Sequence, residues 1–224
     1  MSSVVFDIET LAFPLENFDD VQQEYLLKFA DTDEKRDQEL QKLNLNALTA
    51  QIIAIAMFNP ETRAGKVFFQ SNKQEHFFSE DDKIEFTASD ERALLVGFWE
   101  AIRHYDRFIT FNGRSFDCPF LLLRSAILHV PPTRNLMPYR YSAAEHCDLL
   151  DQLTFYSAVR KFNLDFYCKT FDIKSPKSEG ITGLDLGPLY REGRFHEISN
   201  YCLGDVIATA ELFKQWNEFL NIKE

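Results

Sequence analysis

Residues 4–10 read VVFDIET, and this stretch combines the pattern of a buried strand with two carboxylates. Its apolar residues are β-branched or aromatic, as in a strand that packs in a core. Strand side chains alternate, so Asp7 and Glu9 point to the same face. Two neighbouring anions at the edge of an apolar core repel each other and lose hydration, and a divalent cation is the simplest compensation. A solvent-facing strand end with two ordinary acids is the alternative explanation of this stretch alone.

Length and composition indicate one domain, residues 1–224, with residues 15–46 as an insertion. The hydrophobic content of 45%, with 22 Phe, is ample for a substantial core. The first strand begins without a preceding basic and apolar leader, and the longest clean apolar run, 52–58, is too short to span a bilayer. The four cysteines form no CxxC pair, so neither a zinc framework nor a disulfide framework is expected. A reduced, cytoplasmic protein without membrane contact fits best.

The charge is unevenly distributed along the chain. A net charge of −11 argues against tight, nonspecific binding of duplex nucleic acid, because phosphate binding usually leaves a basic surface. Residues 16–42 contain nine acids and four bases, whereas residues 103–194 contain thirteen bases and ten acids. Acids that bind metal are also neutralised by it. A small site for single-stranded nucleic acid therefore remains compatible with the composition.

The pattern of apolar residues predicts an α/β protein with a mixed sheet flanked by helices. Early strands followed by strand–helix alternation favour a mixed sheet over an all-parallel one. The predicted strands are residues 3–9, 51–59, 66–70 and a short strand within 107–113. The predicted helices are residues 89–105 with Ser89 as N-cap, 115–128, a helical section starting at 146–156, and 197–219.

The insertion at residues 15–46 is polar, acidic and helix-forming. Its apolar residues at helical spacing are Val21, Tyr25, Leu26 and Phe29. Such a stripe needs a cover. We expect the insertion to pack back over the site as an acidic lid that rejects duplex, because it leaves the chain directly after the acid pair. A docking surface for a protein partner is the alternative.

Two further segments carry carboxylates in suitable contexts. FNGRSFDCPF places Asp117 after a strand–loop junction and at the start of a helix, where an acid is also favoured by the helix dipole. YCLGDV places Tyr201 and Asp205 four residues apart, hence on one face of the last helix. An ordinary surface pair on an amphipathic helix is the alternative for the second segment.

The acid pair, the N-x-x-x-F-D segment and Y-x-x-x-D occur in an order that resembles the three motifs of the DEDD superfamily of 3′–5′ exonucleases. The chain looks most like the tyrosine-type branch, in particular the stand-alone proteins related to the exonuclease domain of family-B DNA polymerases. The resemblance covers residues 4–11, 109–125 and 196–212, and the insertion has no counterpart in it. The histidine-type branch has a His five residues before the last Asp, and this chain has Asn200 there.

The resemblance implies a ribonuclease H-like fold in which Asp7, Glu9, Asp117 and Asp205 bind two divalent metals, Mg²⁺ or Mn²⁺. Such oxygen ligands suit these ions, and two metals roughly 4 Å apart can activate water and stabilise the leaving oxygen. The implied reaction is hydrolysis of phosphodiester bonds at the 3′ end of single-stranded nucleic acid, with DNA favoured. The alternatives are an RNA-trimming exonuclease, and a non-catalytic nucleic-acid-binding or proofreading subunit that works with a partner.

The resemblance also implies roles for residues beside the metal ligands. Tyr201 would orient the attacking water, and a phenol with an ordinary pKa near 10 is a poor base at pH 7. Thr10 and Leu11 match positions that back the terminal nucleotide. Asn112 and Phe116 match positions that contact the strand, although turn chemistry and core packing are alternatives for them. From the residues alone, Asp148 is expected to be a helix N-cap and His196 a surface histidine.

Overall fold

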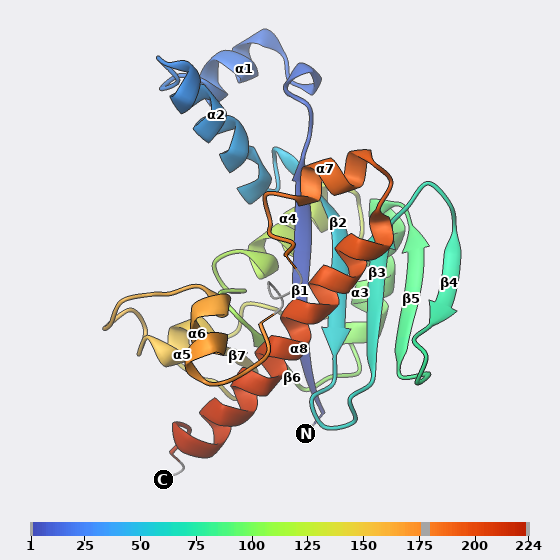
Figure 1. Cartoon of the computed structure of the whole chain (residues 1–224), viewed down its shortest axis with the longest axis vertical. Helices are drawn as coiled ribbons and strands as arrows, with labels where there is room; N and C mark the ends of the chain where they lie inside the picture. Colours follow the sequence, from blue (N-terminus) through green and yellow to red (C-terminus); the bar gives the residue numbers. More distant parts are fainter. Residues whose placement is uncertain (1, 176–179, 223–224) are drawn as a thin grey trace.

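The computed structural model describes residues 2–175 and 180–222, and their centre is a mixed sheet with helices on both faces (Figure 1). In the described part of the chain the sheet has seven strands in the order β4-β5-β3-β2-β1-β6-β7. The strands are β1 Ser3–Ala12, β2 Ala50–Phe58, β3 Gly65–Gln70, β4 Glu75–Phe78, β5 Ile84–Ser89, β6 Arg107–Thr110 and β7 His146–Asp148. β1 pairs antiparallel with β2 and parallel with β6, so it lies in the middle of the sheet.

The helices bury both faces of the sheet. They are α3 Glu91–Ile102, α4 Asp117–Ile127, α5 Leu149–Leu153, α6 Leu164–Thr170, α7 Leu186–Arg191 and α8 Phe195–Phe219. Val5 of β1 packs in the core cluster that contains residues of α5, α7 and α8. Phe6 and Ile8 pack in the other cluster, with α3 and α4. Because β1 has a core on each side, its sequence is apolar almost throughout, and the acid pair interrupts only the α8 face.

The insertion projects from one end of the molecule, beyond the sheet (Figure 1). It consists of the 3₁₀ helices η1 Leu15–Asn17 and η2 Leu43–Leu45 and, between them, α1 Asp20–Leu26 and α2 Asp33–Lys42. Asp19 and Gln22 form a capping box on α1, and Thr32 caps α2. This confirms a helical insertion after the first strand.

The expected lid is not formed by the apolar stripe of the insertion. Val21, Tyr25 and Phe29 are 76%, 77% and 73% exposed, and Leu26 is half-buried. The expectation that this stripe packs back over the site is therefore wrong. The reason is the direction of the chain after β1, which runs away from the sheet before α1 and its apolar stripe begin (Figure 1).

Several boundaries differ from those expected. Asp90, not Ser89, caps α3 by accepting a hydrogen bond from the Ala93 amide at 2.8 Å, because Ser89 is still paired with Gln70 in the sheet. The helical section expected from residue 146 begins with the three-residue strand β7. The sequence reading missed β4 and β5, although alternate residues of β5 are buried, as in a strand with one core face.

A buried ion pair holds the chain on both sides of the insertion, at Phe13 and Ala47, against the body. The Arg124 guanidinium donates to both carboxylate oxygens of Glu91, at 2.8 and 2.6 Å, and to the Ala47 carbonyl at 3.2 Å. It also lies over the Phe13 ring, 5.2 Å from the ring centroid. Glu91 in turn accepts a hydrogen bond from the Ile52 amide at 2.8 Å. Arg124 thus contacts Phe13, just before the insertion, and Ala47, directly after it.

Arg124→Met should lower the free energy of unfolding by about 3–5 kcal/mol, because it leaves the Glu91 carboxylate buried without its cation. Urea unfolding followed by circular dichroism measures the change. Arg103→Met is the matched control, since Arg103 pairs with Glu100 at 3.2 Å on the surface, and it should cost no more than about 1 kcal/mol. Equal stability of the two variants would contradict a structural role for the buried pair.

Candidate active site

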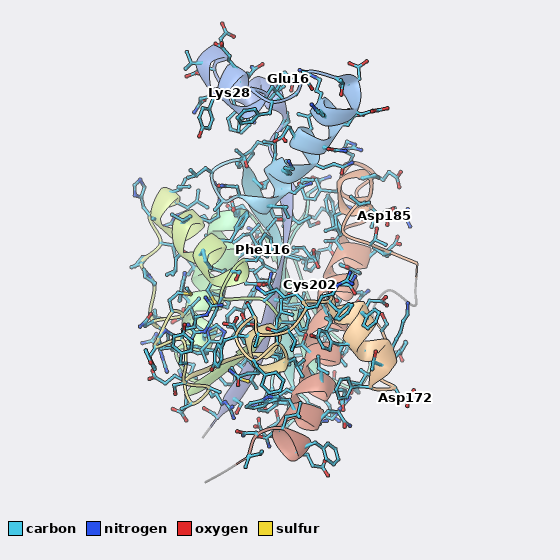
Figure 2. All side chains as sticks on the ribbon, turned by 90° about the vertical axis from the view of Figure 1, so that its left-hand side faces the viewer. Glu16, Lys28, Phe116, Asp172, Asp185 and Cys202 are labelled. Carbon is cyan, nitrogen blue, oxygen red and sulfur yellow. The ribbon has the colours of Figure 1, made fainter. Side chains whose placement is uncertain are left out.

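The two acids of β1 lie together on the face that α8 covers. The ligand atoms of Asp7, Glu9 and Cys202 all lie within 4.8 Å of one another. Figure 2 shows Cys202 in the middle of the molecule, near β1 and below the insertion. The pairing of β1 with β2 shifts register between Glu9 and Thr10, and such irregularities commonly re-aim side chains beside functional sites. The same-face geometry expected for Asp7 and Glu9 is therefore present.

Asp117 reaches the acid pair from the first turn of α4. Its carboxylate is 2% exposed and accepts a hydrogen bond from the Ile8 amide, which lies between the two strand acids, at 3.0 Å. After burial and the charges of Asp117, Asp205 and Glu9, a side-chain hydrogen bond with Asp117 also raises the pKa of Asp7. Among the described residues, Asp117 and Asp205 do not join the group whose atoms lie within 4.8 Å.

A tight loop before α4 holds Asp117 in place. Asn112 adopts a left-handed conformation with φ 64°, which asparagine tolerates better than most residues. A Cβ on Gly113 would lie 2.5 Å from Thr110, so a side chain cannot fit there. Asp148 accepts hydrogen bonds from the amides of Asn112 and Arg114, both at 2.9 Å, and also caps α5 through the Leu150 amide. The turn role of Asn112 and the cap role of Asp148 are confirmed.

α8 brings a second polar group toward the strand acids. Tyr201 and Asp205 lie one turn apart on this helix, and Asp205 raises the pKa of Glu9 and of Tyr201 through its charge. The Cys202 thiol, on the turn between them, donates to the Asp7 carbonyl at 3.6 Å. The last helix is therefore held directly against the part of β1 that carries the acids.

Burial and like charge raise the pKa of Asp7, Glu9 and Asp117. For Asp7 and Glu9, burial raises the pKa most, and the charges of Asp117 and Asp205 add to it. Burial raises the pKa of Asp117 to about 7, against backbone hydrogen bonds that lower it. These carboxyl groups cannot all be ionised near neutral pH without a cation. Hard oxygen donors in this arrangement fit a divalent ion such as Mg²⁺ or Mn²⁺.

Tyr201 and Cys202 remain protonated beside the carboxyl groups. Burial, followed by the charges of Asp205, Glu9 and Asp7, raises the pKa of Tyr201. Burial and the same acids raise the pKa of Cys202 well above its ordinary value. A neutral thiol is a poor ligand for a hard cation, so the oxygen atoms are the relevant donors. The Tyr201 hydroxyl can form hydrogen bonds but is not an anionic base.

A groove of about 760 Å³ opens beside Glu9. Thr10 and Phe116 line it on the body side, and Phe116 is half-buried against Phe120, with ring centroids 5.5 Å apart. Phe116 thus has both a packing contact and an open face. Figure 2 shows it near the centre of the molecule, with Glu16 and Lys28 of the insertion region at the far upper end.

The base of the insertion forms the opposite wall of this groove. Gln38, Gln41 and Lys42 of α2 line it. The Thr10 hydroxyl donates to the Asn44 carbonyl at 2.7 Å, so its side chain is engaged by the insertion stem. Leu11 packs with the α8-side core near Gly187. Sequence reasoning missed the α2 residues, because polar positions on a charged helix carry no periodic signal.

Comparisons with known proteins agree with this arrangement. Residues 45–220 match the family described as "Predicted 3'-5' exonuclease related to the exonuclease domain of PolB", and the chain belongs to this family. The matched range includes Asp117, Tyr201 and Asp205, whereas Asp7 and Glu9 precede it. The resemblance stated from the sequence is thus confirmed at the level of the family.

The fold is similar to part of the family B DNA polymerase from the hyperthermophilic archaeon Pyrobaculum calidifontis. The TM-score is 0.64 at 18% sequence identity, and the likeness covers 98% of this chain and 25% of the polymerase. This confirms a ribonuclease H-like mixed sheet flanked by helices. The chain spans about a quarter of that polymerase's length. No curated protein matches the chain. Within residues 2–175 and 180–222, no helix is long and apolar enough to cross a membrane.

The contribution of Asp117 to the stability of the chelator-treated protein should fall as pH rises from about 4 to about 7. The folded protein retains protons in this interval that the unfolded chain releases, since the pKa of Asp117 is raised from 3.8 to about 7. Its stabilising contribution is therefore complete below the ordinary pKa and lost as pH passes the folded value. Mg²⁺ or Mn²⁺ should restore stability above pH 7 by neutralising the carboxylates. Differential scanning calorimetry measures both effects.

Asp7→Asn tests whether the buried carboxyl groups of the site, and not a general effect of pH, cause the change in stability. At pH 8 without metal the variant should melt above the wild type, because one buried charge is gone, and it should lose most of the metal-dependent shift. Asp82→Asn is the control, at an exposed left-handed position with φ 56° that asparagine tolerates. A metal-dependent shift of wild-type size in Asp7→Asn would remove Asp7 from the metal site.

Proposed function

We propose that the chain is a metal-dependent 3′–5′ exonuclease that hydrolyses phosphodiester bonds at the 3′ end of single-stranded nucleic acid, with DNA favoured. The observation that carries this proposal is geometric: Asp7 and Glu9 of β1 lie together, Asp117 of α4 accepts a hydrogen bond from the Ile8 amide between them, and α8 contacts the same strand through Cys202. A structural protein gains nothing from buried like charges, which destabilise it. Family membership supports the same reaction.

We assign the binding of two divalent ions, Mg²⁺ or Mn²⁺, to Asp7, Glu9, Asp117 and Asp205. When bound, such ions activate water and stabilise the leaving 3′ oxygen. Tyr201 orients the attacking water by a hydrogen bond from its neutral hydroxyl, because its raised pKa prevents it from accepting the proton as a phenolate. The hydrogen bond from the Ile8 amide holds one oxygen of Asp117 at a fixed angle to the strand acids.

The groove beside Glu9 supplies the contacts to the terminal nucleotides in this proposal. The open face of Phe116 stacks on a base, and the backbone at Thr10 and Leu11 backs the terminal nucleotide. The Asn112 side chain contacts the strand from the loop that carries Asp117. A single strand can bend into this space, whereas a paired end would have to separate first.

Two alternatives share the same site. An exoribonuclease is compatible with it, because the carboxylates act on the phosphate and do not by themselves distinguish the sugar. A non-catalytic subunit of a proofreading assembly is the alternative without activity. The presence of all four acids together with Tyr201 favours activity in the isolated chain.

Asp7→Ala, Glu9→Ala, Asp117→Ala and Asp205→Ala should each lower the rate by at least about 10³-fold, because each removes a ligand of a shared metal site. The assay uses 5′-labelled single strands of DNA and RNA with Mg²⁺, Mn²⁺ or chelator. It should give products that shorten from the 3′ end and release mononucleotides. Asp82→Asn serves as the exposed acid control, since asparagine tolerates the left-handed backbone there. Shortening from the 5′ end, or cuts within a circular single strand, would disprove the assignment.

The insertion has two distinct surfaces in this proposal. Its base, with Gln41 and Lys42, belongs to the substrate groove, whereas the exposed stripe of Val21, Tyr25 and Phe29 lies outside it. We assign the stripe to a protein partner, because three large apolar side chains, two on α1 and one in the turn after it, are exposed among acids. A partner with a complementary basic rim fits the acidic surroundings.

Gln41→Ala combined with Lys42→Ala should raise KM for single strands roughly 3- to 10-fold and leave kcat nearly unchanged, because contacts to the bound strand are lost away from the reacting atoms. Replacement of residues 19–31 by a Gly/Ser linker should leave both constants unchanged. Steady-state kinetics on single-stranded and duplex ends compares the two variants. A loss of single-strand preference in the linker variant would restore the lid explanation.

A further inference from the structure

A cluster of exposed tyrosines lies outside the groove. Tyr139 and Tyr141 are 74% and 62% exposed, and their ring centroids are 5.7 Å apart. Tyr141 also contacts Tyr156, with centroids 4.9 Å apart. We call these three residues the tyrosine shelf. Phe155, the chain neighbour of Tyr156, is 63% exposed. Large aromatic side chains gathered at the surface mark a binding site more often than scattered ones do.

The backbone beneath the shelf is held in an unusual conformation. Phe155, Tyr156 and Ser157 all have positive φ, at 49°, 56° and 73°. None is a glycine, and bulky residues rarely adopt this region. The Tyr156 amide donates to the Asp151 carbonyl at 2.7 Å, and the Gln152 amide group donates to the Tyr156 hydroxyl at 2.9 Å. Local hydrogen bonds thus stabilise a strained turn whose aromatic side chains lie at the surface. Backbone strain of this kind is often found in functional segments.

The chain segment that carries the shelf contains more bases than acids, although the whole chain is acidic. Residues 134–161 contain four bases and three acids, and two of those acids, Asp148 and Asp151, are buried. Arg140 lies between the two tyrosines in the sequence, and its guanidinium is fixed by Asp151 at 2.6 and 2.9 Å. Arg160 lies over the Phe162 ring, 5.0 Å from its centroid. Interleaved aromatic and cationic groups are the components of surfaces that bind single strands.

Arg114 connects the shelf to the loop of the candidate active site. This residue lies between Asn112 and Asp117, and its guanidinium donates to the carbonyls of Pro138 and Tyr139 at 3.0 and 3.4 Å. Its own amide donates to Asp148. The shelf therefore begins one arginine side chain away from the loop that carries Phe116. A strand whose 3′ end occupies the groove can continue over this surface.

We propose that the tyrosine shelf binds single-stranded nucleic acid upstream of the 3′ end, by stacking bases on Tyr139 and Tyr141 while Arg140 faces the phosphates. This inference rests on the proposed function. Stacking accepts any base, so the shelf extends the footprint without sequence preference. Paired bases are already stacked within a duplex, so the same surface favours single strands. The insertion, which would bind the proposed protein partner, projects from one end of the molecule, away from α5 (Figure 1).

The test measures binding in chelator, where no cleavage occurs, by fluorescence anisotropy with labelled single strands of about 4 and about 16 nucleotides. Tyr139→Ala combined with Tyr141→Ala should weaken binding of the long strand roughly tenfold or more and leave the short strand unaffected. Tyr139→Phe with Tyr141→Phe should bind like the wild type, because stacking is preserved. Phe78→Ala, a half-exposed aromatic on edge strand β4, is the control and should also bind normally.

The outcomes separate this inference from the function on which it rests. A wild type that binds and shortens single strands, together with an alanine variant of unchanged affinity for the long strand, would overturn the shelf alone. A wild type that neither binds nor shortens any strand would overturn the proposed function. An equal loss for the short and long strands would also contradict the shelf, since it would place the tyrosines at the 3′ end or indicate damage to the fold.

Discussion

Carboxyl groups that share a buried space cannot all carry their charge, and this constraint governs the centre of the molecule. Asp7 and Glu9 are fixed on an inner strand that is paired on both sides, so they cannot move apart to relieve repulsion. The hydrogen bond from the Ile8 amide holds one oxygen of Asp117 beside the same strand. Asp205 of α8 is close enough for its charge to act on Glu9. The surrounding packing therefore keeps these carboxyl groups close together. Protonation relieves their repulsion in acid, and the proposed metal ions would relieve it at neutral pH.

The sequence could reveal these acids because each lies where local periodicity determines its direction. Strand alternation puts Asp7 beside Glu9, and one helical turn separates Tyr201 from Asp205. The packing of α4 against β1 brings together residues that are 109 positions apart, so no local pattern predicts the Ile8–Asp117 hydrogen bond. Resemblance to a known family supplied that part. Family membership and fold are confirmed, while the roles of the individual residues stay predictions.

The errors have physical causes of the same kind. The stripe of the insertion was expected to be covered. The chain on either side of the insertion is instead held by Arg124, which is 77 positions from Ala47 and 111 positions from Phe13 (124 − 13). The groove wall from α2 was not foreseen, since amide side chains on a charged helix look like ordinary solvated residues. β5 could have been found, because Ile84, Phe86 and Ala88 alternate with less buried neighbours.

The antiparallel pairing of β1 with β2 makes the whole insertion a very long hairpin connection. The two ends of the insertion are joined where the Phe13 amide donates to the Thr49 carbonyl at 2.9 Å. The pairing of β1 with β2 is therefore complete before the insertion begins. The entropy of such a loop grows only slowly with its length. The tip of this connection is accordingly a suitable site for inserting a foreign domain. A fluorescent reporter placed there would sit at one end of the molecule, with its two attachment points side by side.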